Sequence, residues 1–351
     1  MTTMKEIAHR AGVSVSTVSL VLNNRDEGRV NADTAANVRA IAKAMGYRPN
    51  PLARSLRTSR TRIIGFVSEE IATTPYAGGI VLGAQDAASE LGYMMITVNT
   101  DGRANEERQL AALKRYGVDG FLYAKMSNRV TTAPGGIAGY PTVIVDAVDG
   151  SGGIPSIAPD ETRIGYDATR HLIDAGCRRI AYVGCAEPML AEGLRLEGYR
   201  SALRDAGIEP DDDLAIRVWF NQPALDAVSR LFDERHPDGF FCFNDARAWY
   251  VYECAARRGL VVGRDVSVVG VDNHRVIAET FAPQLTTVEL PHYEMGYWSV
   301  CRLVSLIEDR PLDDVTPPRT TAPLPPFDAD GPVSIHCTLI EKDSVAHHAA
   351  A

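Results

Sequence analysis

The chain has 351 residues, of which 45% are hydrophobic, and it carries a formal net charge of −9. This length suggests two or three domains, and the hydrophobic fraction excludes a chain that is disordered by composition. No apolar run approaches the ~18 residues that a membrane span needs, and the first residues contain no apolar signal segment. We therefore expect a cytoplasmic protein without a membrane partner.

The charge is distributed unevenly along the chain. Residues 1–62 contain eleven lysines and arginines but only four acidic residues, and the remaining residues have a large acidic excess. A small basic head on a large acidic body favours a protein that meets a polyanion only through its head, although chance clustering of solvated charges would give the same totals. The six cysteines have no metal-binding or redox spacing, so we expect no metal, no cofactor and no disulfide.

Three short helices are predicted in the basic head. Apolar residues with helical spacing occupy residues 4–11, and Gly12 then ends that helix because glycine adopts positive φ at little cost. Ser14 is a typical N-cap for a second helix over residues 15–22, and a third amphipathic helix is expected over residues 32–45. Two helices joined by a short turn with glycine are typical of a helix-turn-helix, whose second helix enters the major groove of DNA.

Two sequence strings make this prediction more specific. Residues 5–19 (KEIAHRAGVSVSTVS) and 46–57 (GYRPNPLARSLR) resemble the DNA-binding headpiece of the LacI/GalR family of bacterial transcriptional regulators. The resemblance implies base contacts from Val15, Ser16 and Leu20. Leu20 can offer bases only an apolar contact, and packing into the core of the head is the alternative role for both Val15 and Leu20. Short polar side chains near this helix are donors suited to phosphate oxygens, although they could instead cap helices or face solvent: Ser14, Thr17, Ser19 and Asn23.

Residues 50–61 are expected to form a hinge between the head, residues 1–49, and the body. In the family that the sequence resembles, a short hinge helix forms on DNA and a leucine wedges into the minor groove. Leu56 matches that position, and Arg54 and Arg57 are placed to neutralise nearby phosphates. An ordinary arginine-rich linker is the alternative interpretation.

From residue 62 onward, short apolar runs alternate with amphipathic stretches, several of which end at a glycine. Such runs are typical of buried strands, and the alternation predicts an α/β fold with parallel sheets flanked by helices. The family resemblance extends to about residue 345 and implies a two-lobed body like that of the periplasmic binding proteins. We expect lobes formed by residues 62–158 with 290–322 and by residues 159–289 with 323–345, followed by a disordered tail over residues 346–351.

A two-lobed fold of this kind binds its ligand between the lobes, at the carboxyl ends of the strands. Charged and amide groups near an aromatic ring suit a sugar, which we expect as the effector. The family resemblance implies cleft positions for Tyr76, Met189, Arg195 and Phe220 (or Trp219). Asn244, Asp245 and Asp272 are candidates because they directly follow predicted strands, and Asp160 is a further candidate. Helix capping is the alternative for Asp160 and Asp245, and a salt bridge across the lobes is the alternative for Arg195 and Asp272.

The resemblance implies a sequence-specific DNA-binding regulator, most simply a repressor. It would bind a near-palindromic double-stranded operator as a homodimer, or as a tetramer, and respond to a small effector. The alternatives are a regulator that answers to a purine or nucleoside and a solute-binding protein without a DNA role. The sequence contains no phosphate-loop, zinc-protease or serine-hydrolase motif, so we do not expect an enzyme.

Overall fold

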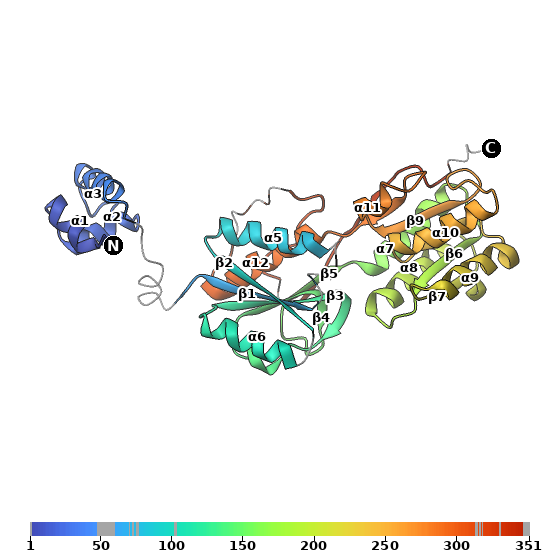
Figure 1. Cartoon of the computed structure of the whole chain (residues 1–351), viewed down its shortest axis with the longest axis horizontal. Helices are drawn as coiled ribbons and strands as arrows, with labels where there is room; N and C mark the ends of the chain where they lie inside the picture. Colours follow the sequence, from blue (N-terminus) through green and yellow to red (C-terminus); the bar gives the residue numbers. More distant parts are fainter. Residues whose placement is uncertain are drawn as a thin grey trace. The chain divides into compact units, whose positions relative to one another are not determined.

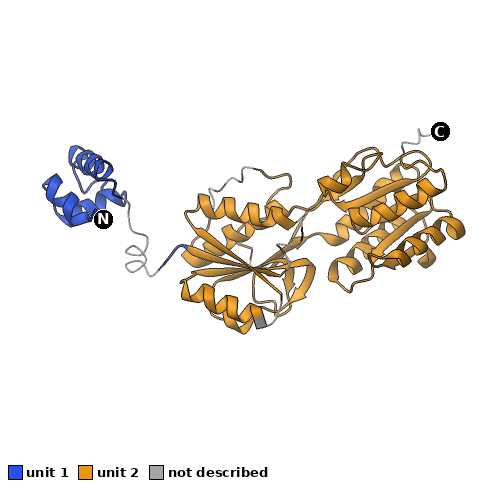
Figure 2. Cartoon of the chain, in the orientation of Figure 1, with its two compact units in different colours: residues 1–62 blue, residues 63–351 orange. Residues whose placement is uncertain are grey.

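Two compact units make up the chain in the computed structural model, one formed by residues 1–62 and the other by residues 63–351 (Figure 2). The structure describes residues 2–47, 60–69, 71, 74, 77–101, 104–312, 315, 317, 319–329 and 331–346. The hinge candidates Arg54, Leu56 and Arg57 and the cleft candidate Tyr76 lie outside the described residues. Within the described residues, no helix is both long enough and apolar enough to cross a membrane.

The head is a bundle of three helices: α1 (Met4–Ala11), α2 (Val15–Leu22) and α3 (Ala32–Ala44). Gly12 adopts a φ of 67° and ends α1, and the Ser14 hydroxyl accepts a hydrogen bond from the backbone N–H of Thr17. All three helices contribute fully buried side chains to one core, which contains Ile7, Val18, Val21 and Val38. The predicted helices and both of these end signals are confirmed.

The first lobe is built on a parallel sheet with the strand order β11-β5-β4-β3-β1-β2. Figure 1 labels β1 to β5 of this sheet. The strands are β1 (Ile63–Glu69), β2 (Met94–Thr100), β3 (Gly120–Thr131), β4 (Thr142–Asp149), β5 (Ser156–Pro159) and β11 (Pro332–Ile335). One face packs against α5 (Gly78–Glu90) and α12 (His292–Glu308). The other face packs against α6 (Ala104–Arg115) and the short turn η2 (Gly135–Ile137).

The second lobe repeats this plan with the strand order β12-β10-β9-β8-β6-β7. Its strands are β6 (Ile180–Cys185), β7 (Ala215–Val218), β8 (Gly239–Cys242), β9 (Ser267–Asp272), β10 (Thr286–Glu289) and the antiparallel β12 (Thr338–Ile340). One face packs against α7 (Glu161–Asp174) and α8 (Leu190–Asp205). The opposite face packs against α9 (Gln222–Arg230), η4 (Leu231–Arg235), α10 (Asp245–Arg257) and α11 (Arg275–Ala278), and η3 (Asp212–Leu214) precedes β7.

The C-terminal part of the chain is divided between the lobes differently from the prediction. Residues 323–345 were expected in the second lobe, but β11 pairs with β5 in the sheet of the first lobe, and only β12 joins the second sheet. The reason is that β11 is a four-residue edge strand held by its pairing partner and by the burial of Ile335, neither of which shows in the local sequence. Ala346, assigned to the tail, is buried and donates its backbone N–H to the Ser267 hydroxyl at 3.0 Å.

Glycines bring one helix pair in each lobe into close contact. A Cβ at Gly83 of α5 would collide with the carbonyl oxygen of Tyr293, and one at Gly296 of α12 would collide with that of Ile80. In the second lobe, Gly165 of α7 and Gly198 of α8 approach the opposite backbone in the same way. These contacts position α7 and α8, which carry several polar side chains of the cleft.

Candidate functional site

The exposed start of α2 is the candidate DNA-binding surface. Val15 is 42% exposed and Ser16 is exposed, so both are available to base edges. Leu20 is partly exposed and is not among the side chains packed against the core of the head, which argues against its alternative role.

The short polar side chains of α2 make contacts within the helix itself. Ser14 caps the helix and lies 2.9 Å from the Thr17 hydroxyl, and Asn23 donates to the Ser19 carbonyl at 2.6 Å. The capping alternative is therefore confirmed for Ser14. Phosphate contacts from these four residues remain a prediction, since a hydroxyl that accepts one bond can still donate another.

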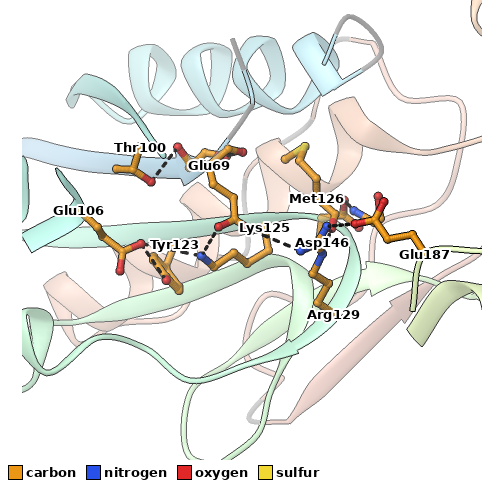
Figure 3. A network of polar contacts seen from close by, with 11 residues as sticks. Glu69, Thr100, Glu106, Tyr123, Lys125, Met126, Arg129, Asp146 and Glu187 are labelled. Atoms are coloured by element: carbon orange, nitrogen blue, oxygen red, sulfur yellow. Dashed lines mark hydrogen bonds and ion pairs between the residues drawn. The ribbon is translucent and has the colours of Figure 1, made fainter. Parts of the chain in front are cut away.

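Polar residues converge where the strands of the two lobes end at their carboxyl sides. In the first lobe, the Lys125 ammonium on β3 lies 3.0 Å from Glu69 at the end of β1 and 3.8 Å from Glu106 on α6 (Figure 3). The Tyr123 hydroxyl donates to Glu106 at 3.0 Å. Burial opposes the charge of Lys125, but its contacts with Tyr123 and Glu69 outweigh burial and raise its pKa, so this lysine is a cation.

Asp146 lies at the same edge of this sheet, and the sequence analysis did not select it. It is 5% exposed, and its carboxylate accepts hydrogen bonds from the backbone N–H groups of Ser127 at 2.9 Å and Asn128 at 3.2 Å. Ser127, Asn128 and Asp146 all have positive φ. They lie at the place where the β3–β4 register is interrupted. Burial, followed by the charge of Glu161, raises the pKa of Asp146 to about 8. An acidic residue directly after an apolar strand run was the signal that could have found it.

Arg195 lies in the second lobe as part of a buried ion pair. Its Nε lies 2.6 Å from Glu161 Oε2, one Nη donates to the Phe243 carbonyl at 2.5 Å, and its guanidinium lies 4.4 Å from the Phe243 ring centre. Both charged side chains are almost fully buried. A salt bridge was the alternative for Arg195, but that expectation was wrong in placing it across the lobes, because α7 and α8 of one lobe carry both partners.

Asn244 and Asp245 have different roles, although they are adjacent. Asn244, not Asp245, is the N-cap of α10, because its side chain accepts from the Arg247 backbone N–H. Asp245 is fully buried and accepts from the Thr287 hydroxyl at 2.6 Å and the His274 backbone N–H at 2.8 Å. Burial raises the pKa of Asp245 to about 7. The capping alternative is therefore wrong for Asp245, whose carboxylate ties β10 to the loop after β9.

Asp272 has the most available carboxylate of the predicted cleft residues. It ends β9 with a φ of 111°, and within the described residues its side chain makes no hydrogen bond. Burial, followed by the charge of Asp245, raises the pKa of Asp272 well above its usual value. Beside it lies a cavity of about 690 Å³ lined by residues of both lobes, among them Gly79, Leu82 and Tyr293 from the first and Asp272, Asn273 and Glu289 from the second.

Two further candidates, Asp160 and Met189, have local structural roles. Asp160 is the N-cap of α7 and accepts from the Arg163 backbone N–H at 3.0 Å, so its capping alternative is confirmed. Met189 precedes α8 and packs with Cys185, Ala191 and Phe243.

Phe220 is 62% exposed, and its ring lies 4.3 Å from the guanidinium of Arg247. Arg247 donates to Asn244 Oδ1 at 3.1 Å and so joins two predicted residues, but the sequence analysis missed it. Its position on the first turn of α10 was the available signal.

Comparison with known proteins agrees with both units. The sequence model of the bacterial regulatory proteins of the lacI family matches residues 3–50, and that of the periplasmic binding proteins and sugar binding domain of the LacI family matches residues 61–324. The chain belongs to the LacI family. This LacI-family protein is 35% identical to the HTH-type transcriptional regulator RegA of Clostridium saccharobutylicum, over 89% of this chain and 95% of RegA. It is 33% identical to the ribose operon repressor of Escherichia coli, over 88% of this chain and 93% of that protein.

Solved structures of transcriptional regulators have the same fold. The complex of the transcriptional regulator CelR with cellobiose has a TM-score of 0.64 and 28% sequence identity, covering 98% of this chain and 100% of that one. A LacI-family regulator from Rhizobium etli has a TM-score of 0.69 and 28% identity, covering 82% of this chain and 100% of that one.

Proposed function

We propose that this LacI-family protein is a cytoplasmic repressor, not an enzyme, and that it binds a near-palindromic operator as a homodimer. A small effector, in our proposal a sugar, binds between the lobes of the body and controls operator affinity. The observation that carries the proposal is the presence, in one chain, of a basic helix-turn-helix head and of a cleft with polar side chains at the strand ends. The names of similar proteins, among them sucrose and ribose operon repressors, support it.

On the DNA side, the start of α2 reads bases through Val15, Ser16 and Leu20. Ser14, Thr17, Ser19 and Asn23 contact phosphates and set the register of the helix in the groove. In the hinge, residues 50–61, Leu56 wedges into the minor groove between two flanking phosphate contacts from Arg54 and Arg57.

On the effector side, Asp272 accepts hydrogen bonds from hydroxyl groups of the effector, and the Asn244 amide can both accept from and donate to them. Tyr76 or Phe220 supplies an aromatic face against the effector. Arg195 helps to position these effector-binding residues through its bonds to Glu161 and the Phe243 carbonyl. Met189, which packs with Phe243, contributes an apolar surface to the cleft. The effector acts on DNA affinity because it binds one arrangement of the two lobes better than the other.

The test is DNA selection followed by a salt titration. Duplexes with two randomised half-sites are selected on the full chain, and the affinity for the selected duplex is measured by fluorescence anisotropy at rising salt. Affinity should fall steeply, since two heads release several counterions from the phosphates. A set of neutral sugars is then added to find one that changes the affinity. Absence of DNA binding at low salt, with and without sugars, would sink the proposal.

A further inference from the structure

An ion pair crosses from the first lobe of the body to the second (Figure 3). Arg129 lies on β3, and its Nη2 is 3.3 Å from the Oε1 of Glu187, which lies in the loop between β6 and α8. The two side chains are 39% and 48% exposed, so water screens the bond and its contribution is small. A weak bond between the lobes favours one arrangement of them without fixing it.

Arg129 also has a carboxylate partner within its own lobe. Its Nη1 lies 3.8 Å from the Oε1 of Glu69 at the end of β1, and Glu69 is itself paired with Lys125 at 3.0 Å. The Nε of Arg129 donates to the Met126 carbonyl at 3.1 Å, which holds the guanidinium in place. Arg129 is therefore shared between one carboxylate of each lobe.

The backbone before Arg129 directs this side chain towards the second lobe. The β3–β4 register is interrupted between Ala124 and Arg129, and Ser127 and Asn128 adopt positive φ there. The buried carboxyl group of Asp146 accepts the backbone N–H groups of both residues and so holds the irregular segment. Since an irregularity of this kind re-aims the side chains that follow it, Asp146 is a positioning residue for Arg129.

The two partners of the ion pair differ in what remains to them when it breaks. Arg129 keeps Glu69, whereas Glu187 has no second cation within ion-pair distance in the part of the chain that the structure describes. Glu187 is half exposed, so water solvates it. Breaking an ion pair is costly when a charge is left buried and alone, and neither charge is left so here. The contact between the lobes is therefore made and released at small cost.

We infer that Arg129 exchanges between Glu187 and Glu69 and thereby sets the balance between two arrangements of the lobes. In the arrangement seen here Arg129 contacts both carboxylates, and in the other it contacts Glu69 alone. The inference rests on the proposed function, because the lobe arrangement must control operator affinity for the exchange to have an effect on DNA. It requires no contact between the effector and Arg129 or Glu187.

The test measures the operator affinity of full-chain variants without effector, by fluorescence anisotropy on the selected duplex. Glu187→Arg replaces the attraction between the lobes by a repulsion and should change the affinity by about three- to tenfold. Glu69→Gln removes the competing carboxylate, leaves Arg129 to Glu187 and should change the affinity in the opposite direction. When Arg129→Gln is already present, Glu187→Arg should lose most of its effect, because the two residues act as a pair.

Arg200→Glu is the matched control for a reversed charge. Arg200 is 37% exposed and pairs with Asp212 at 2.6 Å, but both residues belong to the second lobe, so this variant should change the affinity by less than about twofold. Thermal unfolding of each variant establishes that it is folded.

Three results would each overturn the inference while the proposed function stands. They are an unchanged affinity in Glu187→Arg, a change of the same direction in Glu69→Gln, and an undiminished effect of Glu187→Arg beside Arg129→Gln. An effect of Arg200→Glu as large as that of Glu187→Arg would also overturn it, because the change would then not depend on a contact between the lobes. If the original chain binds no DNA, the inference and the proposed function both fail.

Discussion

Buried and exposed arginines in the body both form ion pairs with carboxylates, but breaking the two kinds of pair costs very different amounts of stability. Arg195 pairs with Glu161 where the two side chains are 4% and 1% exposed, and Arg163 pairs with Asp167 where they are 54% and 23% exposed. A buried ion pair is costly to break because its remaining charge stays desolvated, whereas an exposed pair is screened by water.

We predict that Arg195→Gln lowers the free energy of unfolding by about 3–5 kcal/mol, because Glu161 is left as an unpaired buried charge. Arg163→Gln should lower it by no more than about 0.5 kcal/mol. Urea unfolding of both variants measures the difference. Equal effects of the two substitutions would contradict the role assigned to the buried pair.

The raised pKa of Asp146 makes a pH dependence predictable. The folded carboxyl, with a pKa of about 8, holds its proton over a range in which the unfolded one, near 3.8, has lost it. The contribution of Asp146 to stability is therefore fully present below pH about 4 and is lost as the pH rises towards about 8.

Asp146→Asn should remove this dependence. The difference in unfolding free energy between the variant and the original chain should move in favour of the variant by up to about 1.4 kcal/mol per pH unit within the window. Urea unfolding at a series of pH values measures this difference. Because Asp245 is present in both proteins, the effect of its titration on stability cancels in the difference. A difference that stays constant with pH would show that Asp146 is ionised in the folded protein.

At the scale of elements, the close helix pairs explain where glycine is required. Gly198 and Gly193 lie in the same helix, α8, but a Cβ at Gly198 would meet the backbone of Thr162, whereas a Cβ at Gly193 would meet nothing within 4 Å. Overpacking against backbone is destabilising because a carbonyl group cannot rotate away.

We predict that Gly198→Ala destabilises the body by at least about 2 kcal/mol. Gly193→Ala should be neutral or stabilising by up to about 1 kcal/mol, since alanine is favoured over glycine within a helix. Thermal unfolding of the two variants provides the comparison. A harmless Gly198→Ala would mean that α7 and α8 are packed less closely than the structure shows.

The same scale shows which elements could be predicted from sequence. The apolar runs at residues 63–67, 120–123, 142–145 and 180–183 all lie within observed strands, because a buried parallel strand is apolar on both faces. The longer edge strand β2 contains the apolar run at residues 94–98, but two short edge strands, β7 and β11, were missed. They have four residues each and are only partly buried, so tertiary pairing and not local composition makes them strands.

At the scale of the whole molecule, the two units divide the charge between them. The basic residues are concentrated in residues 1–62, and the body is acidic. The head alone therefore provides attraction to a polyanion, and the body is repelled by it.

We predict that a chain shortened to residues 63–351 unfolds within about 2 °C of the full chain and still binds the effector, because its core is its own. It should have no measurable DNA affinity at any salt concentration, since the counterion-releasing residues are gone. Differential scanning calorimetry and anisotropy measure the two properties. Retained DNA binding by the shortened chain would refute the assignment of the DNA contacts to the head.

The sequence by itself determined the features that depend on a few neighbouring residues. The helices of the head, the Ser14 cap, the Gly12 stop and the alternation of strands and helices all follow from local geometry and apolar spacing. The tertiary structure alone decided which polar groups are buried and which are paired. It placed Glu161 beside Arg195, buried Asp146 and left Asp272 free to line a cavity. The physical reason is that burial and ion pairing depend on which strand and helix ends meet in space, and residues distant in sequence bring those ends together.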